Sequence, residues 1–238
     1  METTAFFNSG PRPNAWRELG DLSDDSLVER ARQHDLAAFE ALMRRHNRRL
    51  FRVARGVLRD SDEAQDAVQE AYLRAYRGLA GFRGEAKLST WLVRIVANEA
   101  LMRRRRRART AAVVPLDATA ASTEEWNSLM SDRPGPEQDA SRAEMRRMIE
   151  ARIDGLPDSY RAVFVLRALE ELSVEETAGV LQIPEATVRT RFFRARALLP
   201  EGLAREVDRG LEVAFAFAGE RCDRIVANVL AAVKRSTA

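Results

Sequence analysis

Residues 173–199 decide the fold of this chain, and they read SVEETAGVLQIPEATVRTRFFRARALL. Ser173 is followed three residues later by Glu176, a spacing that starts helices, so we predict a helix from there to about Leu181. Gln182-Ile183-Pro184 interrupts it. A second helix is expected from about Glu185, because proline and an acidic residue are both favoured in the first helical turn. The spacing predicts a helix-turn-helix.

The second of these helices has two different faces. Its apolar stripe, predicted to face the core, consists of Val188, Phe192, Ala195 and Leu199. The opposite face combines small residues, hydroxyl groups, guanidinium groups and one aromatic ring, which is the set that a reader of the DNA major groove needs. A solvated basic helix is the alternative, but Phe193 and Thr190 are poor choices for solubility.

Composition limits the class of protein. With 45% hydrophobic residues the chain can bury real cores, and its net charge of +3 means that any nucleic-acid binding depends on where the basic residues lie. The single cysteine, Cys222, excludes a disulfide within one chain. Alternating β-branched patterns are scarce, so we expect an all-α fold. With no signal peptide and no apolar run of about 20 residues, we expect a cytoplasmic protein without membrane insertion.

The first half of the chain contains two expected helices rich in functional signals. Residues 36–58 keep an apolar stripe, on which His46 is interpreted as a satisfied core or boundary histidine. Asp60-Ser61 is expected to cap a helix that runs to about Leu79, whose first turns carry acidic residues. These acids could suggest a metal or acid/base site, but acids are favoured at helix N-termini and no histidine lies nearby. A docking face for a protein partner is the other interpretation.

A glycine-rich loop and an arginine-ended helix follow. The loop, 78–90, contains an aromatic residue and two basic ones, and Ser89 is expected to cap a helix beginning TWLVRIVANEALM. Trp91, Arg94 and Asn98 fall on one side of this helix, which ends in the five arginines 103–107. The arginines could serve solubility alone. Beside aromatic residues and an asparagine, they favour binding of single-stranded nucleic acid and phosphate.

Three stretches of the chain carry a family pattern. They are DEAQDAVQEAYLRAY at 62–76, FRGEAKLSTWLVRIVANEA at 82–100 and LPDSYRAVFVLRALEELSVEETAGVLQIPEATVRTRFFRARALL at 156–199. In this order they resemble a bacterial sigma factor of the sigma-70 family. The resemblance is to the extracytoplasmic-function (ECF) group, which keeps only the second and fourth conserved regions.

The resemblance implies a role for each stretch. Residues 62–76 would dock on the clamp helices of the β′ subunit of core RNA polymerase, and the fourth region on its β flap. The implied polymerase contacts are Asp62, Asp66, Gln69 and Glu70. The implied contacts with the minus-ten DNA element are Phe82, Arg83, Lys87, Ser89, Thr90, Trp91, Arg94, Asn98, Arg103 and Arg105. The implied contacts with the minus-thirty-five element are Ala186, Thr187, Arg189, Thr190, Phe193 and Arg194.

The remaining segments complete the predicted organisation. The acidic composition of 109–141 fits a solvated tether, or, as the family implies, a segment that passes through positive channels of the polymerase. Arg161 and Arg167 are candidate phosphate contacts. We expect the extension at 204–238 to form two helices that pack on the fourth-region domain or bind a regulator such as an anti-sigma factor. Cys222 is expected to be a buried small hydrophobe.

These expectations divide the chain into a flexible leader (1–22), a region 2 domain (23–108), a flexible acidic linker (109–141), a region 4 domain (142–203) and a helical C-terminal extension (204–238). The expected function is promoter recognition and opening of duplex into single-stranded DNA by RNA polymerase, without catalytic residues, metal or cofactor. A helix-turn-helix regulator that acts on duplex operators without joining polymerase is the alternative, but it leaves 62–100 without a role.

Overall fold

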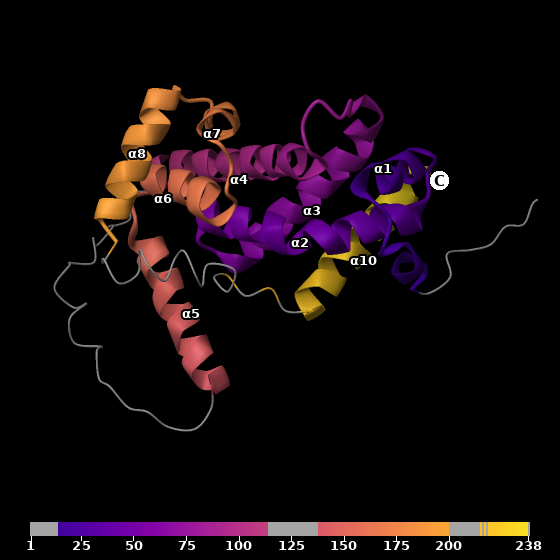
Figure 1. Ribbon diagram of the computed structural model, residues 1–238, viewed down its shortest axis with the longest axis horizontal. Helices are drawn as coiled ribbons and strands as arrows, with labels where there is room; N and C mark the ends of the chain where they lie inside the picture. Colours follow the sequence, from indigo (N-terminus) through magenta and orange to yellow (C-terminus); the bar gives the residue numbers. More distant parts are fainter. Residues whose placement is uncertain (1–13, 114–137, 200–214, 216, 218, 238) are drawn as a thin grey trace, which may run out of the picture.

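The computed structural model describes residues 14–113, 138–199, 215, 217 and 219–237 (Figure 1). All regular structure within these residues is helical, which confirms the predicted fold class. No helix in these ranges has the length and apolarity needed to cross a membrane. In chain order the helices are η1 (Ala15–Leu19), α1 (Asp24–Arg32), α2 (Leu36–Leu58), α3 (Ser61–Gly78), η2 (Leu79–Gly81), α4 (Leu88–Val113), α5 (Gln138–Gly155), α6 (Asp158–Phe164) with a π-helical continuation (Val165–Leu169), α7 (Val174–Leu181), α8 (Glu185–Ala197) and α10 (Gly219–Thr237).

Helices α1–α4 form an N-terminal bundle built around the long α2 (Figure 1). Both α2 and α3 begin at the predicted places, because an aspartate caps each of them. The Asp35 carboxylate accepts hydrogen bonds from the first-turn N–H groups of α2, and Asp60 does the same for α3. These backbone hydrogen bonds lower the pKa of Asp60. Inside the bundle, the hydroxyl of Tyr72 donates to the carbonyl of Met43.

His46 is structural, as its place on the apolar stripe predicted. Its side chain is buried, and its Nε2 lies 3.0 Å from Oδ2 of Asp24, near the start of α1. Burial lowers the pKa of His46, although the Asp24 carboxylate opposes this effect. The histidine therefore ties α2 to α1.

Residues 14–22 are ordered, so the predicted flexible leader is too long. The half-buried ring of Trp16 lies 4.3 Å from the Arg44 guanidinium, and Leu19 is buried. Arg45 also donates hydrogen bonds to two carbonyls of this segment. A 3-10 helix of five residues is too short to produce a periodic pattern, which explains why the sequence did not reveal it. Residues 1–13 lie outside the described part.

The predicted linker is also too long at both ends. Helix α4 continues to Val113, and α5 begins at Gln138 rather than near 142. The rest of the acidic segment, 114–137, lies outside the described residues.

Helices α6–α8 form a C-terminal bundle that contains the helix-turn-helix, and α5 leads into it with Ile149 and Ile153 buried near its end (Figure 1). The predicted capping box is present at the start of α7, where Ser173 and Glu176 exchange side-chain to backbone hydrogen bonds of 3.0 and 2.8 Å. On α8, Val188 and Ala195 are fully buried, as predicted. Phe192 stacks on Phe164 with 6.4 Å between ring centroids.

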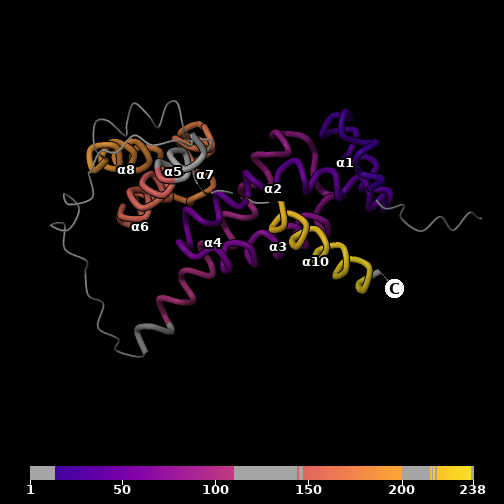
Figure 2. The backbone as a smooth tube through the Cα atoms, turned by 90° about the horizontal axis from the view of Figure 1, so that it is seen from below, coloured from indigo at the N-terminus to yellow at the C-terminus, as the bar shows by residue number. Residues whose placement is uncertain are grey.

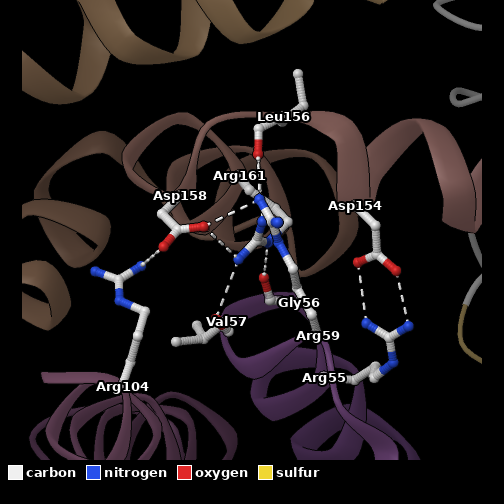
Figure 3. A network of polar contacts seen from close by, with 9 residues as sticks. All are labelled: Arg55, Gly56, Val57, Arg59, Arg104, Asp154, Leu156, Asp158 and Arg161. Carbon is white, nitrogen blue, oxygen red and sulfur yellow. Dashed lines mark hydrogen bonds and ion pairs between the residues drawn. The ribbon is translucent and has the colours of Figure 1, made fainter. Parts of the chain in front are cut away.

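The two bundles are packed against each other through Arg161 of α6 (Figure 3). Its side chain is 1% exposed, and its guanidinium donates to the carbonyls of Gly56 (2.6 Å), Val57 (3.2 Å) and Leu156 (3.2 Å) and to Asp158 (2.9 Å). The last carbonyls of α2 have no partner within their own helix, so they need such a donor. Burial lowers the pKa of Arg161 to about 10. The prediction of a phosphate contact at this residue is wrong.

Further ion pairs join α2 to the second half of the described chain. Arg55 makes a bidentate contact with Asp154 at 2.9 and 2.7 Å (Figure 3). Glu170, which is almost fully buried, lies 2.8 Å from Arg49 and 2.9 Å from Arg52. Burial raises the pKa of Glu170, while the two arginines oppose this effect.

The close approach of the bundles also needs a glycine. A Cβ atom on Gly56 would lie 2.5 Å from Cγ2 of Val165. Because a contact under about 3 Å is not tolerated between carbon atoms, any larger residue at this position would force the π-helical segment away from α2.

Helix α10 packs on α3 and α2, not on the C-terminal bundle (Figure 2). The prediction that the extension covers the fourth-region domain is therefore wrong for this helix. Cys222 is half-buried, and its sulfur accepts a hydrogen bond from Asn47 at 3.1 Å. The first helix predicted for the extension, before 215, lies outside the described residues.

Replacing Arg161 should destabilise the protein strongly. In Arg161→Met, the carbonyls of Gly56 and Val57 lose their donor and Asp158 loses one of its cationic partners, so we expect the free energy of unfolding to fall by about 3–5 kcal/mol. Urea denaturation measures this change. Arg48→Met, an exposed arginine of α2, is the control and should change the stability by less than about 0.5 kcal/mol. Equal stability of both variants would show that the Arg161 contact is not needed.

Candidate nucleic-acid and polymerase interfaces

The outer face of α8 exposes the side chains that the sequence predicted. Phe193 is 74% exposed, although a phenylalanine normally seeks a core. Ala186, Arg189, Thr190 and Arg194 are exposed beside it, and Thr187 is half-buried. The buried stripe of the same helix holds this face outward.

An open groove of about 440 Å³ runs along this face. Ser159, Tyr160 and Arg191 line it together with residues of the predicted set. The Arg194 guanidinium lies 3.3 Å from the Tyr160 hydroxyl, which ties α8 to α6. Sequence reasoning missed Tyr160, because only the tertiary structure brings α6 beside α8.

Two polar side chains of this face, Arg189 and Thr190, bond to residues of their own helix. Arg189 forms an ion pair of 2.6 Å with Glu185, and the Thr190 hydroxyl donates to the carbonyl of Ala186 at 2.9 Å. Both contacts are exposed to solvent, so a phosphate or a base edge can replace them at low cost.

The loop before α4 is fixed, and its aromatic residue faces inward. Phe82 is buried, with its ring centroid 5.1 Å from that of Trp91. Arg32 holds the loop by donating to the carbonyls of Leu79 and Phe82. Phe82 therefore belongs to the core, whereas the sequence predicted a DNA contact. The basic residues of the loop, Arg83 and Lys87, are exposed as expected.

Thr90, predicted to contact DNA, is covered by the C-terminal bundle. It is buried, and its hydroxyl donates to Oε1 of Glu176 on α7 at 3.1 Å. Glu176 also caps α7, so one carboxylate joins the helix-turn-helix to α4. Its hydrogen bond with the Ser173 backbone is the main cause of its lowered pKa. Helix α4 begins at Leu88, one residue before the predicted cap Ser89.

One side of α4 keeps the predicted polar character. Arg94 and Asn98 are exposed one turn apart, and Trp91 is half-buried against Phe82. The indole ring is therefore backed by the ring of Phe82, while the two polar side chains are exposed to solvent.

The arginine run of α4 is partly neutralised. Glu99 is buried and lies 2.8 Å from both Arg103 and Arg74. Arg107 contacts Glu63 at 3.3 Å, while Arg105 is exposed. An open groove of about 870 Å³ between α3 and α4 includes these residues. The run is thus a mixed-charge surface. The Glu99–Arg103 pair follows from i,i+4 spacing, whereas the burial of Glu99 and its contact with Arg74 come only from the tertiary structure.

The acidic residues of α3 lie along one exposed face. The Asp62 side chain is 92% exposed and Asp66 is exposed, whereas Glu70 pairs with Arg74 at 3.2 Å. Gln69 accepts a hydrogen bond of 3.2 Å from Asn228 of α10. Among the residues in the described ranges, no group of three possible metal ligands occurs.

Comparisons with known proteins found matches to both halves of the described chain. The pattern of Sigma-70 region 2 matches residues 42–110, and that of Sigma-70, region 4 matches residues 146–199. The chain is 36% identical over 190 residues to the RNA polymerase sigma-H factor of Pseudomonas aeruginosa. The aligned residues cover 78% of this chain and 96% of that protein. The chain is 35% identical over 175 residues to the ECF RNA polymerase sigma-E factor of Escherichia coli K12, covering 74% and 91%.

The chain belongs to the sigma-70 family, in its ECF group. As a sigma factor it binds core RNA polymerase and promoter DNA and directs transcription initiation. Region 2 corresponds to most of α2, α3 and α4, and region 4 to most of α5 through α8. The presence of region 2 favours this function over a helix-turn-helix regulator that acts without polymerase.

One solved structure is similar to this sigma factor over most of its length. It is CnrH in complex with the cytosolic domain of CnrY, with a TM-score of 0.50 and 25% identity. The likeness covers 77% of this chain and 98% of that chain.

The burial of Phe82 can be tested by stability. Phe82→Ala should lower the free energy of unfolding by about 3 kcal/mol, because it leaves a cavity beside Trp91. Arg83→Ala, its exposed neighbour, should change it by less than about 0.5 kcal/mol. Urea denaturation of both variants gives the comparison. An unchanged Phe82→Ala midpoint with weaker binding of single-stranded DNA would instead assign the ring to DNA.

Proposed function

We propose that the outer face of α8 reads the minus-thirty-five element of the promoter. The observation that carries the proposal is Phe193, which is 74% exposed on a helix whose opposite stripe packs into the core through the fully buried Val188 and Ala195. Arg194 and Thr190 flank the ring and can donate to base edges or phosphates. Ala186 and Thr187 at the start of the helix allow it to approach the groove closely.

We further propose that Arg94 and Asn98 of α4 act at the minus-ten element. Their exposure next to Trp91 supports a site where a base leaves the stack and is held by an amide and a cation. Arg83, Lys87 and Arg105 suit contacts with phosphates. Phe82 acts indirectly, by backing Trp91. A contact through Thr90 requires α7 to move away from α4.

The third proposed surface is the exposed face of α3, which docks on core polymerase through Asp62, Asp66, Gln69 and Glu70. Three of the four residues are acidic, so the face favours a basic partner surface. In this assignment the protein is a specificity subunit with no catalytic activity of its own, and it works in the cytoplasm with the polymerase.

A protein regulator is also expected. CnrH was solved with the cytosolic domain of CnrY bound, and its likeness to this chain supports regulation by a bound protein. The occluded Thr90 fits a factor that has to open before it can use both DNA surfaces.

The assignment of α8 predicts a selective defect for Arg194→Ala. Loss of one charged donor should weaken binding to a promoter duplex carrying the minus-thirty-five element by about 10-fold or more, because a base contact contributes about 1–3 kcal/mol. Fluorescence anisotropy with the holoenzyme measures this affinity. Affinity for core polymerase should not change, and Arg196→Ala on the flank of α8 should bind DNA almost normally. Equal loss of polymerase and DNA binding would show that the arginine is structural.

The assignment of α4 predicts that Asn98→Ala impairs DNA opening more than initial duplex binding. Without the amide, an extruded base loses a hydrogen-bonding partner, so the melted state is less populated. Permanganate reactivity of thymines near the start site reports opening, and anisotropy reports binding. Because Asn98 is exposed, the melting temperature of the protein should be unchanged. Normal permanganate reactivity would contradict the assignment.

A further inference from the structure

Helix α10 has the pattern of a docked amphipathic helix. Its apolar side chains Ile225, Val226, Val229 and Val233 are all at most 3% exposed. They recur at helical spacing and face α3 and α2, while the opposite side of the helix carries exposed charged residues such as Arg224. Figures 1 and 2 both show the helix lying along the N-terminal bundle. The sequence match to region 2 ends at residue 110, so this helix is an addition to that region.

Polar contacts fasten α10 to the face of α3 that is proposed to dock on polymerase. Arg221 donates a hydrogen bond of 2.9 Å to the carbonyl of Ser61 and lies 4.0 Å from the Asp62 carboxylate. Two turns further along α3, Asn228 donates to Gln69 at 3.2 Å. Of the four residues assigned to polymerase binding, Gln69 is therefore hydrogen-bonded to α10, and Asp62 lies at the edge of the contact with its side chain still 92% exposed.

Further contacts tie the start of α10 to α2. Asp223 forms an ion pair of 2.7 Å with Arg44, and the guanidinium of Arg221 lies 4.8 Å from the Phe51 ring. Phe217 lies on the same ring, with 5.2 Å between centroids. The helix is thus held at a defined register and not merely by its apolar stripe.

The segment before α10 is also connected to the C-terminal bundle. The backbone N–H of Phe215 donates to Glu150 of α5 at 2.6 Å, and its buried ring lies 5.2 Å from the guanidinium of Arg55. Arg55 in turn holds Asp154. Separation of the two bundles would remove one of these anchors, so opening of the factor and release of α10 are mechanically linked.

From these contacts we infer that α10 is an intramolecular inhibitor, which covers part of the polymerase-docking face of α3 and has to move when core polymerase binds. This inference rests on the proposed docking role of α3. As part of the same chain, α10 has an effective concentration at α3 on the order of millimolar. Only chains with α10 undocked can bind, so the apparent affinity for polymerase equals the intrinsic affinity multiplied by the undocked fraction.

A reversible lock on the full-length chain tests the inference. Arg44→Cys and Asp223→Cys, in a Cys222→Ser background, place one thiol on α2 and one on α10, outside the four residues assigned to polymerase binding. A bismaleimide with a disulfide in its spacer joins them, and dithiothreitol releases them. The same molecule can therefore be compared locked and released for affinity to core polymerase by anisotropy.

We expect the locked chain to bind core polymerase at least 10-fold more weakly than the released chain. In the otherwise unaltered protein, Arg221→Ala combined with Asn228→Ala should bind about fivefold more tightly than the parent, because the docked state is less populated. Arg224→Ala, on the exposed side of α10, is the matched control and should bind like the parent. Equal affinities of the locked and released chains overturn the inference.

Asp66→Ala separates failure of the inference from failure of the docking assignment. Asp66 is exposed on α3, so its removal tests the docking face in the released chain. If the lock has no effect and Asp66→Ala weakens binding at least 10-fold, α3 docks on polymerase and α10 does not hinder it. If neither has an effect, α3 is not the docking face, and the inference fails with that assignment.

Discussion

The buried guanidinium of Arg161 is the contact on which the arrangement of the two bundles depends. It satisfies carbonyls at the end of α2 that have no partner in their own helix, and its buried charge is compensated by those carbonyls and by the nearby Asp158. Neither the buried guanidinium nor these buried carbonyls would be stable without the other. The two regions are therefore joined by a polar contact that is strong when complete and unfavourable when broken, which suits a joint that is either closed or open.

Closure has consequences at some distance from Arg161. It brings α7 over the start of α4, where Glu176 covers Thr90. It also leaves the outer face of α8 and the Arg94–Asn98 side of α4 exposed. The same packing thus presents most of the proposed DNA contacts and hides one of them. A factor in this state retains its reading helix but lacks part of its minus-ten surface.

Helix α10 adds further contacts to the arrangement in which the two bundles are packed together. It lies on the α3 face, and its preceding segment is anchored to both bundles through Phe215 and Phe217. Arg55 of α2 therefore contacts both Asp154, in the joint between the two regions, and Phe215, which lies just before α10. With α10 acting as an inhibitor, polymerase binding and domain opening are coupled through α2, which contacts both α10 and the C-terminal bundle.

Local chemistry in the sequence determined where helices begin and which way α8 faces. The caps at Asp60 and Ser173 act on N–H groups two or three residues away, and the stripe of α8 follows from helical spacing alone, so both were predictable. The sequence could not place Arg161, Phe82 or α10. Arg161 bonds to residues more than 100 positions away, and the apolar stripe of α10 would fit either bundle equally well. Only the tertiary structure decided these positions, because burial is a property of what packs above a residue and not of the residue's own neighbours in the chain.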